Sequence, residues 1–202
     1  MSNPPPDDVE AELKPTATPG YNPGGSKSPE ELAALDQEDE SLARWKASLG
    51  IVPGTSATPA GPKLHVLTLE LASSTLPSGK TISMDINNPQ EMAAIKKNPI
   101  VIKEGVEYNV RMNFRVSGSI IPGVRYIQLV KRSGIKVDKF EKMLGSYGPR
   151  DEQYTVDFEP DDSPSGIIAR TGTYNVVSRV VDDDGEIHAN WEWQFKIGKE
   201  WA

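Results

Sequence analysis

From Lys63 to the C-terminus, apolar and polar residues alternate with a period of two. A half-buried strand has this pattern, because successive side chains point to opposite faces of a sheet. The same alternation fills residues 187–197, where Trp191 and Trp193 hold apolar positions. The sequence therefore predicts two long strands, and the inward positions of the first are Val106, Tyr108, Val110, Met112, Phe114 and Val116.

Shorter apolar runs between turn signals predict seven further strands. The turn signals include Glu104-Gly105 and Asp184-Gly185, of which the second is typical of hairpins. Many short strands with frequent turns predict an all-β fold, an antiparallel immunoglobulin-like sandwich over residues 63–202. The seven runs are Leu64–Ala72, Ile82–Ile86, Ile100–Lys103, Val124–Lys131, Ile135–Lys139, Gln153–Phe158 and Thr173–Val181.

Residues 1–62 lack this pattern and predict a flexible, largely disordered arm. They hold 10 of the 17 prolines and two of the 14 aromatic residues, which is too little apolar material for a core. One helical segment is expected at about 29–49, because Ser28 offers a cap, Pro29 suits the first helical position and Gly50 ends the segment. Its stripe of Leu42, Trp45 and Leu49 packs either on the sandwich or on another protein, and the pattern favours neither.

The charge is concentrated in the arm. Residues 1–62 carry 10 acidic and 4 basic side chains, so −6 of the net charge of −7 lies there. Without clustered Lys and Arg, nucleic acid is not expected as a partner, and a basic protein surface is favoured instead. The chain has no cysteine, no signal peptide and no long apolar run, which favours a cytoplasmic protein without membrane insertion.

No pattern of catalytic or metal-binding residues emerges, so we expect a binding protein without cofactor or metal and not an enzyme. His65 and His188 both occupy polar strand positions, which predicts two solvated histidines. Asp182 begins a run similar to a calcium loop, but Trp193 stands where the bidentate Glu is needed. The best enzyme alternative is a glycosidase using Glu192, which we expect on the strand face opposite to the two tryptophans.

Five short words of the sequence carry a resemblance to a known family. Together, and in this order over Tyr21 to Trp201, they closely resemble the Rho GDP-dissociation inhibitors. The words are Leu35-Asp36-Gln37-Glu38-Asp39-Glu40-Ser41-Leu42, Lys103-Glu104-Gly105-Val106-Glu107-Tyr108, Tyr126-Ile127-Gln128, Gly145-Ser146-Tyr147-Gly148-Pro149-Arg150 and Trp191-Glu192-Trp193.

The resemblance implies a regulator that binds prenylated, GDP-bound small GTPases of the Rho and Rac type as a monomer in a 1:1 complex. The arm would slow nucleotide exchange, and the sandwich would extract the GTPase from membranes by sheltering its geranylgeranyl group. From the residues alone, large apolar side chains on the inner faces suit an enclosed ligand as well as an ordinary core. A general chaperone for prenylated or acylated proteins is the alternative.

The resemblance also implies functional positions. Contacts to the GTPase switch segments fall on Asp39, Ser41 and Asp184, and the arm stripe adds Leu42 and Trp45, the latter standing where the family usually has tyrosine. Ser28 matches a regulatory phosphorylation position, although Pro29 follows it, and Thr173 is a second candidate. The prenyl-binding positions are expected at Leu69, Ile100, Tyr108, Ile120 and Trp193.

Overall fold

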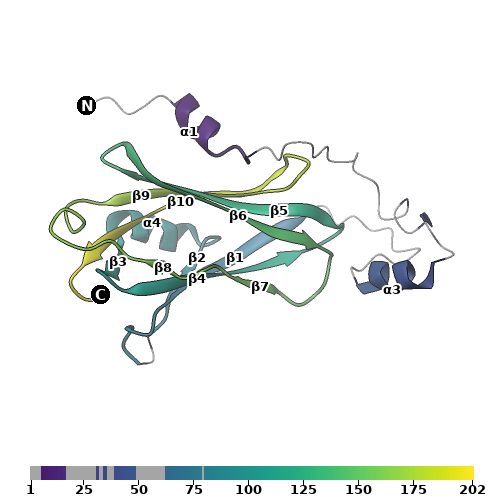
Figure 1. Cartoon of the computed structure of the whole chain (residues 1–202), viewed down its shortest axis with the longest axis horizontal. Coiled ribbons are helices and arrows are strands. Elements are labelled where there is room, and N and C mark those ends of the chain that lie inside the picture. Colours follow the sequence, from purple (N-terminus) through teal and green to yellow (C-terminus); the bar gives the residue numbers. More distant parts are fainter. Residues whose placement is uncertain (1–5, 17–30, 32–33, 36–38, 49–61, 79) are drawn as a thin grey trace.

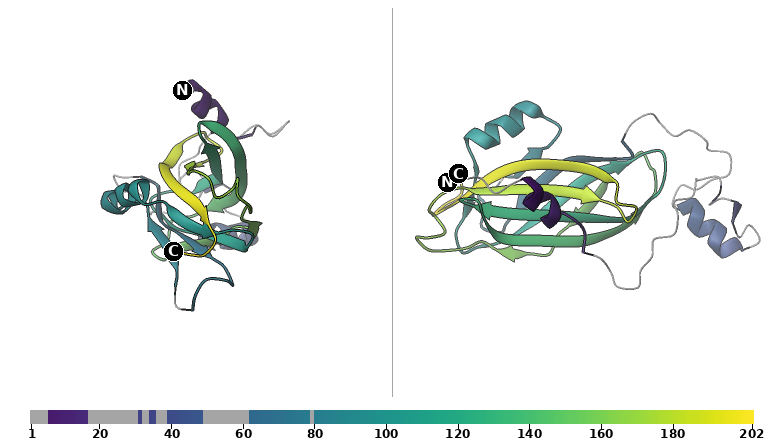
Figure 2. Two further views of the ribbon diagram at one scale, coloured as in Figure 1. Left: turned by 90° about the vertical axis from the view of Figure 1, so that its left-hand side faces the viewer. Right: turned by 90° about the horizontal axis from the view of Figure 1, so that it is seen from above.

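The computed structural model describes residues 6–16, 31, 34–35, 39–48, 62–78 and 80–202, and two sheets pack face to face in it (Figures 1 and 2). The strand pairs are antiparallel, except that β3 runs parallel to β10. One sheet holds β1 (Leu64–Ala72), β2 (Ile82–Asp85), β4 (Glu107–Val116), β7 (Tyr154–Asp157) and β8 (Asp161–Asp162); the other holds β3 (Ile100–Lys103), β5 (Ile121–Arg132), β6 (Ile135–Tyr147), β9 (Tyr174–Val181) and β10 (Ile187–Gly198). The predicted sandwich is confirmed.

The alternation identifies the core-facing side chains of the long strands. Met112 and Phe114 of β4 are fully buried, and Arg111 and Arg115 on either side of this stretch are exposed. Asn113 is an exception, because it is buried at a polar position. Its amide donates to Thr68 Oγ1 at 2.9 Å and to a carboxylate oxygen of Glu70 at 3.0 Å, which replaces the hydrogen bonds of water.

The start of β10 departs from the predicted alternation. The pairing register of β10 with β9 shifts between Ile187 and Ala189, as it does at a β-bulge. Ile187 is consequently exposed, and only 1% of the His188 side chain is accessible. The prediction of a solvated His188 was therefore wrong, whereas His65 is exposed as expected.

A helix that the strand pattern did not predict connects β2 to β3. The helix α4 (Pro89–Lys97) begins after Asn88, whose side chain accepts hydrogen bonds from the backbone N–H groups of Gln90 and Glu91. Its buried residue Ile95 belongs to the main core. Periodicity missed α4 because a single turn-spaced apolar pair, Met92 and Ile95, faces the sandwich.

The prediction of disorder was wrong for residues 6–16, which pack on the outer face of the second sheet. The helix α1 (Pro6–Glu12) is followed by Leu13, which is only 1% exposed and lies in a cluster with Ile127, Leu129 and Val181. Arg179 of β9 donates two hydrogen bonds to the Glu10 carboxylate, at 3.0 and 2.7 Å. This docking explains why both faces of β5 are buried (Figure 1).

The predicted arm helix is interrupted. Glu31 and Ala34 are helical and Leu35 lies in a turn, while α3 (Glu40–Ser48) starts anew after Asp39. Oδ1 of Asp39 accepts hydrogen bonds from the N–H groups of Ser41 and Leu42, at 2.9 and 3.1 Å, and so caps the helix. Ser28, Pro29, Leu49 and Gly50 lie outside the described residues. Within the described part of the chain, no helix has the length and apolar character to cross a membrane.

Candidate functional site

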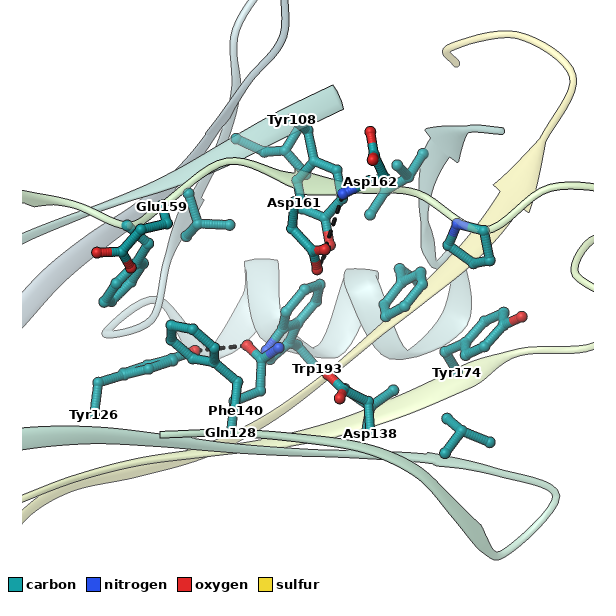
Figure 3. Close-up of a pocket in the computed structure, with 18 of the residues that line it drawn as sticks. Tyr108, Tyr126, Gln128, Asp138, Phe140, Glu159, Asp161, Asp162, Tyr174 and Trp193 are labelled. Atoms are coloured by element: carbon teal, nitrogen blue, oxygen red, sulfur yellow. Dashed lines mark hydrogen bonds between the residues drawn. The ribbon is translucent and has the colours of Figure 1, made fainter. Parts of the chain in front are cut away.

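A cavity of about 450 Å³ lies between the two sheets. Side chains from both sheets line it: Tyr108 comes from β4, Tyr126 and Val130 from β5, Phe140 from β6 and Trp193 from β10. Figure 3 shows Tyr108, Tyr126, Phe140 and Trp193 converging on the space between the layers. The volume falls in the range of pockets that hold small organic ligands, about 300–1,000 Å³.

Aromatic rings form much of the wall. The ring centroids of Tyr126 and Phe158 lie 4.8 Å apart, and Phe140 meets Phe158 edge to face at 5.7 Å. At the other side, Tyr174 and Phe195 stack at 4.7 Å. Such ring pairs give the wall a fixed shape and an apolar surface without charge.

The polar atoms deep in the wall satisfy one another. Trp193 donates from Nε1 to Ser178 Oγ at 3.1 Å, and the Tyr126 hydroxyl lies 2.9 Å from the same oxygen. The Tyr126 hydroxyl also donates to Gln128 Oε1 at 2.7 Å (Figure 3). Burial raises the pKa of Tyr126 far above its ordinary value, so this network stays neutral. The interior of the cavity therefore suits an apolar ligand.

Acidic side chains mark the mouth of the cavity. Asp138 projects from β6, and Asp161 and Asp162 lie opposite on β8, all exposed (Figure 3). Tyr108 of β4 lies next to β8, with its hydroxyl 3.5 Å from Asp161 Oδ2. Burial, and then the charge of Asp161, raise the pKa of Tyr108. An apolar cavity with an acidic entrance suits an apolar chain attached to a cationic segment.

A second, smaller cavity of about 20 Å³ adjoins the first. Leu69, Met84 and Ile100 line it, and it shares Leu71, Val110 and Trp193 with the larger cavity. Trp193 thus contributes to both spaces. The small cavity extends the same apolar layer toward β2 and β3.

The structure brings together four of the five residues predicted to bind an apolar ligand. Tyr108 and Trp193 line the large cavity, and Leu69 and Ile100 line the small one. Ile120 lines neither cavity, because it lies in the loop before β5 and the buried positions of that strand begin at Ile121.

Sequence reasoning missed part of the wall and the whole acidic mouth. Tyr126, Gln128 and Val130 lie two residues apart on one predicted strand, so the alternation could have identified them. Phe140 lies beyond the predicted end of its strand at Lys139. Asp161 and Asp162 fall in a stretch that looks like a turn, since Pro160 and Pro164 flank them.

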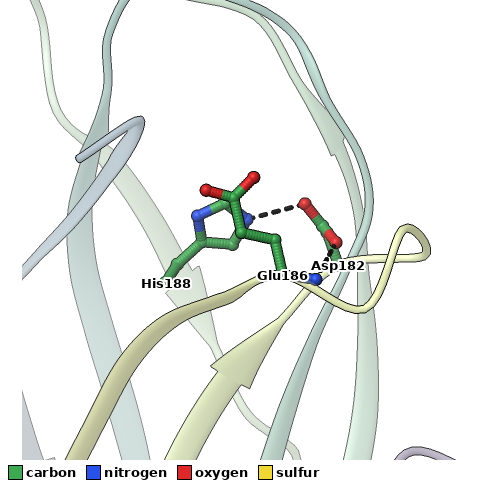
Figure 4. A group of neighbouring side chains, drawn as sticks. All are labelled: Asp182, Glu186 and His188. Atoms are coloured by element: carbon green, nitrogen blue, oxygen red, sulfur yellow. Dashed lines mark hydrogen bonds and ion pairs between the residues drawn. The ribbon is translucent and has the colours of Figure 1, made fainter. Parts of the chain in front are cut away.

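A second candidate surface is the hairpin between β9 and β10. Gly185 has a φ of 81°, in the left-handed region that glycine adopts most easily, and Asp184 beside it is exposed at the tip. Asp182 fixes the base of the tip, because its carboxylate accepts from the Glu186 N–H at 2.9 Å and lies 2.8 Å from His188 Nε2 (Figure 4). The hairpin therefore presents Asp184 from a rigid base.

Asp182, Glu186 and His188 place ligand-type atoms within 4.8 Å of one another. Each of the three already has a partner, because Asp182 pairs with His188 and Glu186 pairs with Lys63 at 2.6 Å. The Lys63 hydrogen bond lowers the pKa of Glu186. We interpret the group as a structural lock of the hairpin.

The arm residues lie on α3, which both views place beyond the hairpin end of the sandwich (Figures 1 and 2). Trp45 is 57% exposed and Leu42 is half-buried, while Ser41 is exposed. An exposed Trp on an amphipathic helix is typical of a surface that meets another molecule. Asp39 caps α3 and thereby orients this surface.

Thr173 and Glu192 belong neither to the wall of the large cavity nor to the hairpin tip or α3. Thr173 is half-buried directly before β9. Glu192 is exposed and pairs with Lys96 at 3.2 Å, while Trp191 and Trp193 on either side are buried. The opposite facing of Glu192 and the tryptophans is confirmed.

Comparison with known proteins gives one consistent result. The family described as RHO protein GDP dissociation inhibitor matches residues 7–200. Rho GDP-dissociation inhibitor 1 of Bos taurus is 41% identical over 181 residues, which cover 90% of this chain and 86% of that protein. The Rho GDP-dissociation inhibitor of Schizosaccharomyces pombe is 40% identical over 91% of this chain and 88% of its own length, and Rho GDP-dissociation inhibitor 3 of Bos taurus is 36% identical over 92% and 80%.

Proposed function

Because this chain belongs to the Rho GDP-dissociation inhibitor family, we propose that it binds a prenylated Rho-family GTPase at two separate surfaces. The family inhibits the dissociation of GDP from Rho GTPases. In our proposal, the cavity between the sheets takes the lipid, and α3 with the β9–β10 hairpin contacts the nucleotide-switch segments.

The cavity is the observation that carries the proposal. Withdrawing a prenyl chain from a bilayer costs about 0.8 kcal/mol per CH₂, which exceeds about 10 kcal/mol for a long isoprenoid. A soluble protein must therefore offer the chain another apolar enclosure. The aromatic cavity of about 450 Å³, with Tyr108 and Trp193 in its wall, is such an enclosure. Leu69 and Ile100 line the small cavity that adjoins it.

The acidic mouth supports the same orientation of the lipid. Membrane-bound GTPases of this kind carry basic residues before the lipidated end, and these residues are attracted to anionic leaflets. Asp138, Asp161 and Asp162 offer a competing negative surface beside the cavity. The excess of acidic residues in the arm adds to the attraction over a longer range.

The arm supplies the nucleotide-dependent part of the proposal. Leu42 and Trp45 would pack on the switch segments, with Asp39, Ser41 and Asp184 as polar contacts. Holding the switch segments in their GDP-bound form slows nucleotide release, because the inhibitor binds that form preferentially. We further propose that the chain acts as a cytoplasmic monomer in a 1:1 complex and without catalysis, and that Ser28 and Thr173 are phosphorylation sites.

A nucleotide-exchange assay tests this division of labour. We expect the full chain to slow release of a fluorescent GDP analogue from a geranylgeranylated Rho GTPase, and a chain lacking residues 1–62 to lose this inhibition while it still binds the lipid. A plain chaperone for prenylated or acylated proteins would behave alike with and without the arm. Failure of the full chain to slow release would refute the proposal.

A further inference from the structure

Four large apolar side chains are exposed together at one end of the sandwich. Ile135 and Val137 lie on the β5–β6 hairpin and are 69% and 51% exposed. Ile167 and Ile168 lie in the loop between β8 and β9 and are 79% and 78% exposed. We call these four residues the apolar rim. The hairpin and the loop that carry them lie at the end of the sandwich opposite to α3 (Figure 1).

The two tips are fixed to each other. Arg132 at the base of the hairpin donates from Nη2 to the backbone oxygens of Ile168 and Thr171, both at 2.5 Å. On the other side of the loop, Arg170 pairs with Glu104, which also accepts from the N–H of Gly166 at 2.9 Å. The loop that exposes Ile167 and Ile168 is therefore held in place by these contacts.

The rim continues into the cavity. Val137 belongs to the rim and also lines the cavity. Arg132 lines the cavity as well, and its guanidinium lies 5.4 Å from the centre of the Tyr174 ring. The Tyr174 hydroxyl donates to the backbone oxygen of Ala169, directly after the two isoleucines, at 3.1 Å. Any surface that meets the rim thus lies beside the cavity mouth.

The hairpin side of the rim is positively charged, although the chain as a whole is negative. Residues 131–139 contain Lys131, Arg132, Lys136 and Lys139 against Asp138, a net of +3 in a chain of net −7. Lys136 also pairs with Glu12 of α1, at 2.8 Å. Projecting apolar tips flanked by Lys and Arg are typical of proteins that bind the interface of anionic membranes.

We propose that the apolar rim inserts into the headgroup region of an anionic bilayer and places the cavity mouth at the membrane surface. The inference rests on the proposed function, because it gives the lipid a short path from bilayer to cavity. Two projecting tips bury their apolar area readily in a soft interface, whereas a protein partner needs grooves that match them. The acidic residues on β8 remain beside the mouth for the basic segment of the GTPase.

Site-specific fluorescence tests the insertion without any GTPase. The chain has no cysteine, so Ile167→Cys can carry a single environment-sensitive label, and Met143→Cys, on β6 away from the rim and 47% exposed, is the matched control. We expect vesicles of phosphatidylcholine and phosphatidylserine to brighten the label at 167 several-fold and lipid-borne quenchers to reach it, with the label at 143 unchanged. No response at 167, or equal responses at both positions, would overturn the inference.

A second variant connects the rim to extraction. We expect the double change Ile167→Ser and Ile168→Ser to slow removal of a prenylated GTPase from these vesicles about tenfold, because less apolar surface enters the bilayer. Affinity for the same GTPase's prenylated C-terminal peptide in solution should stay unchanged, and Met143→Ser should change neither quantity. An equal loss of peptide affinity would overturn the inference, since the rim would then be part of the ligand pocket. If the unaltered chain extracts no GTPase, the proposed function fails, and the fluorescence result alone decides on the rim.

Discussion

At the scale of single residues, Val130 and Val66 differ in their surroundings, because one lies beside the large cavity and the other lies in the packed core. Both are buried valines, but Val130 lines the large cavity, whereas Val66 lies in the packed core of β1 and is not among the residues lining either cavity. Free volume beside a side chain accommodates extra atoms, and close-packed surroundings do not.

We therefore expect Val130→Phe to weaken lipid binding at least about tenfold while the melting temperature stays near that of the parent chain. Val66→Phe, the matched control, should lower the free energy of unfolding by about 1–3 kcal/mol, because the ring has no space there. The measurements are titration with a prenylated peptide and thermal melting. Unchanged lipid affinity in a folded Val130→Phe chain would place the lipid elsewhere.

The two histidines give a second comparison between single residues. His188 is buried against Asp182, and its removal leaves a buried carboxylate with one partner fewer. We expect His188→Ala to cost about 1–3 kcal/mol in the free energy of unfolding, measured by urea denaturation. His65→Ala at an exposed strand position should change it by less than about 0.5 kcal/mol. Equal effects would show that the hairpin lock does not contribute to stability.

At the scale of elements, α1 shows how ion pairs attach a short helix to a sheet. Seven residues form too few internal hydrogen bonds for stability in water, so the helix depends on its docking surface. Leu13 supplies the apolar contact. Arg179 holds Glu10, and Lys136 holds Glu12, so both contacts depend on ionised carboxylates.

The docking should consequently be lost in acid. The hydrogen bond from Arg179 lowers the pKa of Glu10, and that from Lys136 lowers the pKa of Glu12, both from the ordinary value of 4.5. A lowered pKa in the docked state stabilises docking above pH 4.5, and this stabilisation disappears as the pH falls through the lowered values.

Methyl NMR shifts of Leu13 and Ile127 between about pH 7 and about pH 3 would follow the docking, with Val130 as a control for global unfolding. We expect the first two to move toward undocked values while Val130 keeps its native shift. In Glu10→Gln, the pH midpoint of undocking should depend on the protonation of Glu12 alone. Constant Leu13 and Ile127 shifts across this range would contradict the role of the carboxylates.

The elements also show what the sequence could predict. The bounds of β1 and β3 agree with the apolar runs, because these strands carry one clear inward face. The β6 strand runs eight residues beyond its predicted end, since Phe140 to Tyr147 are mostly half-buried and lack an alternating pattern. Residues 6–16 and 89–97 were missed because their helices depend on distant partners or on a cap that periodicity does not detect.

The candidate site follows the same logic. Trp193 and Tyr108 lie in alternating strands, so their inward direction could be predicted, although the cavity beside them could not. A cavity depends on the distance between side chains of the two sheets, and no local sequence pattern predicts that distance. The acidic mouth was missed because β8 spans two residues and pairs with β4 through tertiary contact.

At the scale of the whole molecule, the stretch of the arm that carries α3 is attached to the sandwich on both sides. Thr16 donates from its N–H and its hydroxyl to the Glu141 carboxylate, at 3.0 and 2.7 Å, and Arg125 donates to the Thr16 backbone oxygen at 2.9 Å. The chain then re-enters the sandwich at Leu64 of β1. A tether at both ends raises the effective concentration of α3 near the hairpin that carries Asp184.

This organisation predicts that the lipid and the switch contacts act together on one GTPase. In our proposal, the cavity would supply most of the affinity, because the apolar chain must otherwise remain in water or in a membrane. The arm then acts on a partner that is already bound, so its short helix needs little affinity of its own.

The most direct test of the account is the affinity of the full chain for one GDP-loaded Rho GTPase with and without its geranylgeranyl group, measured by titration in solution. We predict binding at least about a hundredfold tighter with the lipid, and a loss of most of this difference in Val130→Phe. Equal affinity for the two forms of the GTPase would contradict the assignment of the cavity between the sheets as the lipid site.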